Sequence, residues 1–369
     1  MTSEFSLTGA SGGGAMMISA KGRDPILYDF FVDTPPNKNK ELDFFGVDVD
    51  FGDSTQTFHI GKGSAAVPGT LLGLLTVQEH YGRLPLPVIL EPAINAAEQG
   101  IILNSKQAYI FQLLDPIFSY TNAGKDLFHL NGNILCEGDR FRNPDFATFL
   151  EQVSKEGSSF FYFGDGAALI EKYFKDGGLL SREALKIYHV AVRKPVKTKF
   201  SNHIVYSNPA PSVGGTLIIF LLRLVEESGI KNIKISDLLL AMSITNIARK
   251  EICKDPNDEY QINQLLDDKV FQVYLKIFSS KNRIVEKKQP NPSKGSTTHV
   301  SVMDKDLNAA SVTTTNGEGC GYILPGTGIM MNNMLGEQDL NPLGFHKWTH
   351  PMRLPTMISP SIIMKHKKP

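Results

Sequence analysis

The chain has 369 residues, with 38 basic and 38 acidic side chains, and 41% of its residues are hydrophobic. This length is enough to bury a large core and to form one to three domains. The balanced charge, without a dense basic stretch, gives no indication of a nucleic-acid partner. The longest strongly apolar run, residues 217–222, is far shorter than the ~20 residues that a membrane-spanning helix needs. We therefore expect a globular protein that binds neither nucleic acid nor a membrane.

The N-terminal sequence and the cysteines are the features that indicate a cellular compartment. The chain does not start with a basic segment followed by an apolar one, so no signal peptide is visible and a cytoplasmic protein is the default expectation. Cys136, Cys253 and Cys320 are widely spaced and lack a histidine at metal-ligand spacing. We predict buried, reduced thiols, and neither a metal nor a cofactor.

The first 35 residues predict a glycine loop, Gly12-Gly13-Gly14, that leads into strands. Apolar runs at 16–19 and 25–32 provide those strands, and Pro35-Pro36 ends them. No Walker lysine and serine follow the glycines, so a nucleotide site is not expected.

Residues from about 68 to 286 predict mainly helices. Apolar residues recur at helical spacing along two clear stripes: Phe146, Phe149, Leu150 and Val153, and then Ile235, Leu238, Leu239 and Met242. A polar, proline-containing linker follows at 286–296. Strands at both ends of a helical middle indicate an α+β fold.

The segment from Thr297 to Thr315 predicts a β-hairpin centred on Asp306. Apolar residues alternate on each side of a polar turn. If the hairpin is symmetric, Thr297 lies opposite Thr315, and opposed side chains share a sheet face with Cβ atoms roughly 4.5–5.5 Å apart. His299 is expected to pack at the hairpin, and a base role for it is the less favoured alternative.

Thr297 becomes a candidate nucleophile if the chain is cleaved between Ser296 and Thr297. The freed α-amino group, with a pKa of ~7.7–8.0 in model compounds, would supply the base on the same residue. The alternative is that these threonines are strand residues chosen for β propensity. Asp304-x-Asp306-x-Asn308 lacks the later glycine and glutamate of a calcium loop and predicts only a turn.

Several ordered motifs resemble the γ-glutamyltranspeptidase family. Residues 297–308, 313–315 and 325–333 are similar to the start of its small subunit, and residues 11–17, 66–70, 81–85 and 209–215 are similar to landmarks of its large subunit. The resemblance implies the four-layer αββα sandwich of N-terminal-nucleophile hydrolases. It also implies a large-subunit-like segment, 1–296, intertwined in one domain with the start of a small-subunit-like segment, 297–369.

The same resemblance assigns roles to individual residues. Thr297 would be the nucleophile and Thr315 would orient its hydroxyl. The substrate would be bound by Asn316 beside Gly317, where the family asparagine falls, by Asn333, by Glu337 or Asp339 as the amine-binding acid, and by Thr356 in place of a serine pair.

Two departures from the family pattern concern the substrate and the activity. The family arginine that binds the substrate α-carboxylate falls on Phe31, so an apolar acyl group is expected at least as much as γ-glutamyl, unless Arg23 or Arg353 replaces that cation. The family's Gly-Gly oxyanion hole lies beyond the strand at 358–364, and the sequence ends at Pro369. We expect a chain that ends here to be inactive, or to be completed by a further segment.

The leading hypothesis is a self-processing threonine amidohydrolase or acyltransferase that acts on a small-molecule amide or γ-glutamyl compound. Its two segments would stay associated after cleavage, and a homo-oligomer is left open. The alternative is a catalytically degenerate homologue with a structural or interaction role, and a conventional γ-glutamyl transferase comes third.

Overall fold

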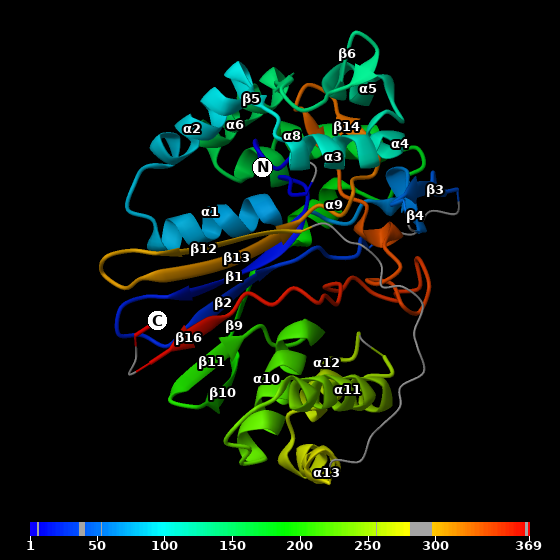
Figure 1. The fold of residues 1–369 in the computed structure, drawn as a ribbon. Coiled ribbons are helices and arrows are strands. Elements are labelled where there is room, and N and C mark those ends of the chain that lie inside the picture. The colour runs from blue at the N-terminus through cyan, green and yellow to red at the C-terminus, as the bar shows by residue number, and fades with distance from the viewer. Residues whose placement is uncertain (6, 37–40, 53, 256, 281–296, 366–367) are drawn as a thin grey trace.

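The computed structural model describes residues 1–369 apart from 6, 37–40, 53, 256, 281–296 and 366–367. Two β-sheets pack face to face, and helices cover the outer side of each sheet (Figure 1). The chain therefore has the predicted four-layer αββα sandwich.

The larger sheet is antiparallel and has five strands in the order β12-β13-β1-β2-β9. Its strands are β12 (Thr298–Met303), β13 (Ala309–Thr315), β1 (Gly13–Ser19), β2 (Ile26–Phe30) and β9 (Ala191–Arg193). The two predicted N-terminal strands and the predicted hairpin are confirmed. Because β1 pairs with β13, two segments that are far apart in the sequence lie side by side at the centre of this sheet.

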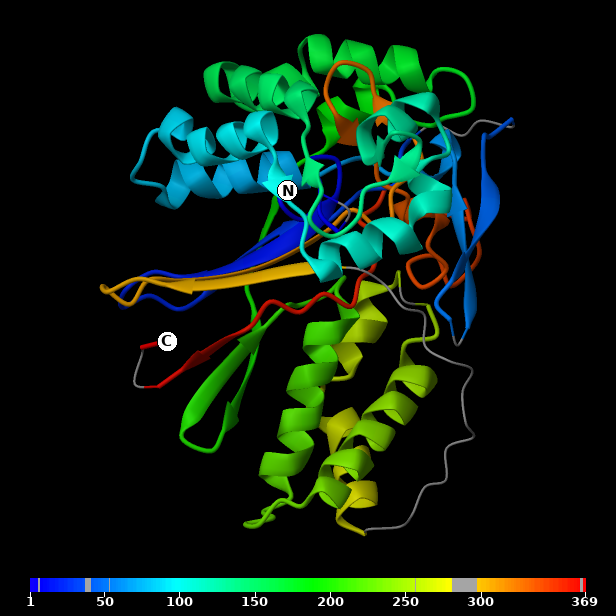
Figure 2. The same ribbon diagram turned by 45° about the horizontal axis from the view of Figure 1, so that its top comes forward.

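The smaller sheet has three strands: β10 (Val196–Phe200), β11 (His203–Ser207) and β16 (Ile362–Met364). The part predicted to be mainly helical contains most of the helices, as expected, but β9, β10 and β11 within it were not predicted, because such short runs carry little periodic signal. The C-terminal segment, red in Figure 2, runs between the larger sheet and the lower helices. Between the sheets, apolar side chains from both form one cluster: Ala15, Met17, Leu27, Tyr206, Ile362 and Met364.

The upper helical layer packs on the other face of the larger sheet. Val77 of the first helix contacts a cluster with Tyr28 and Phe30 of β2. The predicted stripe of α6, which contains Phe146 and Val153, is buried as expected. The helices of this layer are α1 (Thr70–Tyr81), α2 (Leu86–Gln99), α3 (Ser105–Leu113), α4 (Asp115–Phe118), α5 (Asn122–Phe128), α6 (Pro144–Glu156), α7 (Ser159–Tyr162), α8 (Asp165–Phe174) and α9 (Arg182–Ile187).

The lower helical layer consists of α10 (Val213–Glu227), α11 (Ile235–Ile252), α12 (Glu259–Gln264) and α13 (Asp268–Ser279). α11 forms as predicted, but its apolar stripe faces solvent: Ile235, Leu238, Leu239 and Met242 are all exposed. The helix instead buries Ala241, Ile244, Thr245 and Ala248. The helix therefore contacts its neighbours through a different face from the predicted stripe.

Short two-stranded ribbons complete the fold: β3 (Phe45–Asp50) with β4 (Thr55–Ile60), β5 (Ile101–Ile102) with β8 (Arg140–Phe141), β6 (His129–Leu130) with β7 (Asn133–Ile134), and β14 (Ile323–Leu324) with β15 (Ile329–Met330). Within the described part of the chain, no helix is both long and apolar enough to cross a membrane.

Candidate active site

The β12–β13 hairpin has the register that the sequence predicts. Its pairs run from Thr298 opposite Thr314 to Met303 opposite Ala309, so the hairpin is symmetric about residue 306. The Asp304 carboxylate holds the turn, because it accepts hydrogen bonds from the backbone N–H groups of Asp306 (2.9 Å) and Asn308 (2.8 Å). This carboxylate is therefore a turn element, as expected.

Thr297 directly precedes β12 and is exposed. Continuing the observed register by one residue places it opposite Thr315, as predicted. Thr315 is buried at the end of β13, between β12 and β1, where it pairs with Gly13. Its Oγ1 accepts a hydrogen bond of 3.1 Å from the backbone N–H of Gly317. Ser296, the other residue of the predicted cleavage site, lies outside the described residues.

The glycine loop allows the chain to approach β13 closely. A Cβ atom at Gly12 would lie 2.1 Å from the carbonyl oxygen of Thr315, and one at Gly14 would lie 2.4 Å from that of Thr313. Neither distance is compatible with a side chain. The glycines therefore hold β1 against the strand that carries Thr315.

Asn332 links the loops around this strand, and the sequence analysis assigned it no role. Its side chain is fully buried and donates to the carbonyl oxygens of Ser11 (2.7 Å) and Ala66 (2.9 Å). It also accepts from the N–H groups of Ala66 (3.0 Å) and Met334 (3.2 Å). The Asn-Asn pair in the family-like motif was the available signal for this residue.

Asn333 and Glu337 converge with Thr315 on the turn at Gly317. Gly317 adopts a left-handed φ of 62°, and a Cβ atom there would lie 2.1 Å from Asn333 Oδ1 and 2.4 Å from Glu337 Oε1. Asn333 Oδ1 also accepts a 2.9 Å hydrogen bond from the backbone N–H of Glu318. Three of the predicted site residues are thus brought together.

Glu318 is a second buried carboxyl group at this turn, and sequence reasoning missed it. Burial raises the pKa of Glu337 well above its usual range, and the negative charges of Glu318 and Asp339 raise it further. Glu337 therefore keeps its proton to a higher pH than an ordinary glutamate.

Two other predicted substrate residues are engaged elsewhere. The Asn316 amide accepts from Ser11 Oγ (2.9 Å) and donates to the carbonyl of Met330 (3.1 Å), on the face of β13 opposite to Thr315. Thr356 is buried, its Oγ1 accepts from the N–H of Ile358 (3.2 Å), and its carbonyl accepts from Ser212 Oγ (3.1 Å). Asn316 is therefore part of the glycine-loop support, and Thr356 lies at the start of α10.

Arg353 and Arg23, the two predicted replacements for the family arginine, are not positioned to bind a substrate carboxylate. Arg353 is buried and forms ion pairs with Asp33 (2.7 Å) and Asp29 (3.4 Å). It also donates to the carbonyl of Phe31 at 2.8 Å. Arg23 is exposed in the turn after β1, at the end of that strand remote from Gly13. The Phe31 side chain itself is buried in an apolar cluster.

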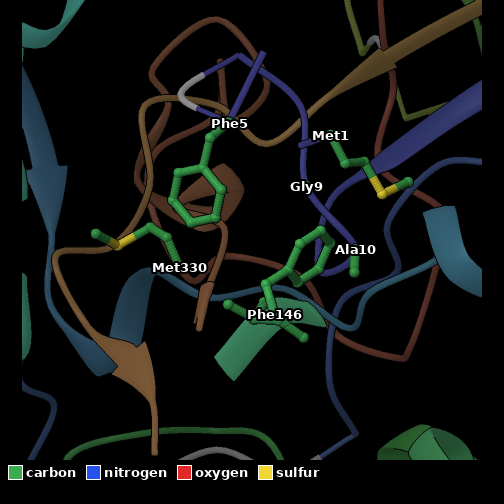
Figure 3. Close-up of a pocket in the computed structure, with 7 residues that line it drawn as sticks. Met1, Phe5, Gly9, Ala10, Phe146 and Met330 are labelled. Carbon is green, nitrogen blue, oxygen red and sulfur yellow. The ribbon is translucent and has the colours of Figure 1, made fainter. Parts of the chain in front are cut away.

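A small pocket beside Gly9 has an apolar lining that includes Phe5, Ala10, Phe146 and Met330 (Figure 3). It offers no polar group to a reaction. Among the described residues, no three His, Cys, Asp or Glu side chains gather as a metal site would require.

Of the cysteines, only Cys320 is fully buried, and burial raises its thiol pKa to about 12. Cys253 is half-buried and Cys136 is exposed, so the prediction of buried thiols is wrong for Cys136. Cys136 follows a short two-stranded ribbon at the surface, where its thiol lies near Gln112.

Comparisons with known proteins show which proteins this chain resembles. The chain is 28% identical over 366 residues to the capsule biosynthesis protein CapD proenzyme of Bacillus anthracis, covering 98% of this chain and 63% of the relative. It is 29% identical over 355 residues to the glutathione hydrolase proenzyme of Escherichia coli, covering 90% of this chain and 59% of the relative. The chain thus spans about three fifths of the length of these two relatives.

The fold matches that of cephalosporin acylase from Bacillus halodurans with a TM-score of 0.78 and 22% identity, covering 100% of this chain and 69% of that chain. The family model described as gamma-glutamyltranspeptidase matches residues 2–369. With the hairpin, the glycine loop and the Asn-Asn turn assembled around Thr315, the chain belongs to the γ-glutamyltranspeptidase family.

Proposed function

We propose that this protein cleaves itself between Ser296 and Thr297 and then acts as a threonine amidohydrolase or acyltransferase. The observation that carries the proposal is the hairpin register, which, continued by one residue, sets Thr297 opposite the buried Thr315 in a chain of this family. Two relatives carry the word proenzyme in their names, which supports processing into segments 1–296 and 297–369.

After cleavage, the α-amino group of Thr297 takes the proton of its own hydroxyl. The oxygen attacks the amide carbonyl, the amine leaves with that proton, and the acyl group stays on Thr297 as an ester. Water then releases the acid, or an amine acceptor takes the acyl group. Thr315 holds the nucleophile in the attacking orientation, because its hydroxyl lies on the same face of the hairpin.

The substrate is a small amide whose acyl group needs no carboxylate. The resemblance places Phe31 where relatives have a carboxylate-binding arginine, and Arg353 is committed to Asp29 and Asp33. Asn333 and Glu337 remain as polar groups near Thr315. A protonated Glu337 can donate a hydrogen bond to a neutral acyl group, and an ionised one can bind an amine.

A matched series of four anilides tests the substrate class. Butyryl, 4-aminobutyryl, glutaryl and γ-glutamyl anilides differ only in whether the acyl chain bears an amine, a carboxylate or both. We expect the two compounds without a carboxylate to have a kcat/KM higher by on the order of 10-fold or more, since a carboxylate bound without a cation loses its hydration and does not gain the charge-assisted contact, worth about 1.5–3 kcal/mol, that would offset this loss. Saturable turnover that favours γ-glutamyl anilide would show that another group binds the carboxylate.

Glu337 predicts a distinct pH dependence. Because its pKa is raised, it becomes an anion only as the pH increases, so the preference for 4-aminobutyryl over butyryl anilide should grow with pH. Glu318→Gln removes a neighbouring negative charge and should move this rise to lower pH. Glu337→Gln should abolish it. The measurement is the ratio of the two kcat/KM values across the whole pH range in which the protein stays folded, and a ratio independent of pH in the unchanged protein would contradict the assignment.

A further inference from the structure

The hairpin carries a ladder of polar side chains on one face. His299 lies opposite Thr313, and Ser301 lies opposite Ser311. His299 Nδ1 is 2.7 Å from Thr313 Oγ1, its Nε2 is 2.9 Å from Ser301 Oγ, and the Ser311 hydroxyl is 3.4 Å from the same Nε2. Both ring nitrogens of His299 are therefore bound by hydroxyl groups.

This ladder continues directly into the proposed nucleophile pair. Side chains two residues apart on a strand share a face, so His299 and Thr313 lie on the same side as Thr297 and Thr315. The same face of the sheet carries Ala15 and Met17, which pack toward the smaller sheet. The successive cross-strand pairs are thus Thr297 with Thr315, His299 with Thr313, and Ser301 with Ser311.

Self-cleavage between Ser296 and Thr297 needs a different base from the later reaction with a substrate amide. Before the bond between Ser296 and Thr297 breaks, the nitrogen of Thr297 belongs to a peptide bond and cannot accept a proton. The imidazole of His299 is the only ionisable side chain in the ladder. In the tautomer that donates from Nε2 to Ser301, Nδ1 accepts from the Thr313 hydroxyl.

We propose that His299 is a positioning residue for self-cleavage, which receives through the Thr313 hydroxyl the proton that leaves Thr297 Oγ. This inference rests on the proposed function. Adjacent pairs on one face are separated by roughly 6.5 Å along a strand, too far for a direct hydrogen bond, so the proposed relay requires water between the Thr297 and Thr313 hydroxyls.

Self-cleavage proceeds through an ester between residue 296 and the Thr297 hydroxyl. Thr297 Oγ bonds to the carbonyl carbon of residue 296 while its proton passes through water and Thr313 to His299 Nδ1. The proton then returns to the Thr297 nitrogen as the C–N bond breaks, which leaves an ester. Water hydrolyses this ester and frees the Thr297 hydroxyl and α-amino group. From then on the amine is the base, and His299 has no further part.

The test follows cleavage of the full chain after a pulse of cell-free synthesis, with intact mass measured at intervals. We expect His299→Ala to slow cleavage at least 100-fold, within the range typical of proton transfer by a side chain. Because His299 is exposed, added imidazole should restore much of the rate. Thr313→Val should be slow and should not respond to imidazole. His203→Ala, which removes a histidine from a strand of the other sheet, serves as the control and should match the unchanged chain.

Turnover of butyryl anilide per cleaved molecule separates this role from a structural one. We expect His299→Ala, once cut, to stay within threefold of the unchanged protein. An unaffected cleavage rate, a slow rate without imidazole rescue, or a parallel loss of turnover would each overturn the inference. An unchanged chain that is never cut would overturn the proposed function as well, whereas a cut chain with normal His299→Ala cleavage overturns this inference alone.

Discussion

Thr297→Ala should leave the protein as one chain of full length, 40.7 kDa in the unchanged sequence, while the unchanged protein separates under denaturing conditions into residues 1–296 and 297–369. Alanine removes the hydroxyl that attacks the preceding carbonyl in the proposed mechanism, so the acyl shift should not start. Intact mass after incubation at neutral pH measures the outcome. The substitution should also abolish turnover, because the same oxygen is the proposed nucleophile.

Thr298→Ala is the matched control for this experiment. Thr298 is adjacent in sequence, but its pairing with Thr314 places it on the opposite face of the hairpin, so its loss should leave cleavage intact. If the unchanged chain stays whole and inactive, the degenerate-homologue hypothesis gains support. If Thr297→Ala is still cut at the same bond, the nucleophile assignment is wrong.

Thr315→Val is expected to have a smaller effect at the same site. Valine keeps the shape and strand propensity of threonine but removes one hydrogen-bonding group. Cleavage should slow by on the order of 10–100-fold, which corresponds to a contact worth ~1.4–2.7 kcal/mol. Normal cleavage at normal thermal stability would show that Thr315 is only a strand residue.

Among substitutions outside the proposed active site, Arg353→Gln should cause the largest decrease in the free energy of unfolding. The guanidinium is buried with Asp29 and Asp33, and it also donates to Tyr188 Oη (3.0 Å) and to the carbonyl of His189 (2.7 Å). Removing the cation breaks the ion pair of Asp33 in a poorly hydrated site, whereas Asp29 keeps its 2.8 Å ion pair with Arg193. Breaking a buried pair in this way costs about 3–5 kcal/mol.

Urea denaturation of the full chain measures this effect. Arg83→Gln provides the control, because Arg83 and Asp306 are exposed and lie 4.0 Å apart. A surface pair of this kind contributes about 0–1 kcal/mol. Equal destabilisation by the two substitutions would mean that the Arg353 network is worth no more than a surface ion pair.

The sequence predicted the features that repeat with a regular period or lie close together in the chain. The hairpin register followed from its symmetric pattern about Asp306, and the buried stripe of α6 followed from helical spacing. The glycine loop was also recognised, although its contact with Thr315 depends on a neighbour about 300 residues away. Local pattern therefore located the hairpin that carries the proposed nucleophile but not the groups that surround it.

What could not be predicted depends on tertiary packing. Ile235 and Leu239 have the spacing of a core stripe, yet α11 packs through the face that carries Ile244 and leaves this stripe exposed to water. Glu318 gave no periodic or motif signal of its own. Its importance arises only because the turn at Gly317 brings it to Glu337, and the fourfold role of Asn332 likewise depends on three separate loops.

The way the two segments share both sheets has a consequence for assembly. β13 pairs with β1 in the larger sheet, and β16 pairs with β11 in the smaller one, so strands on either side of the proposed cut are neighbours twice. Once the connection is broken, the two pieces can separate only by unfolding. Refolding would then be a bimolecular event whose yield depends on protein concentration, whereas the uncut precursor folds as a single molecule. The uncut precursor can therefore refold at a rate independent of protein concentration, whereas the cleaved protein cannot.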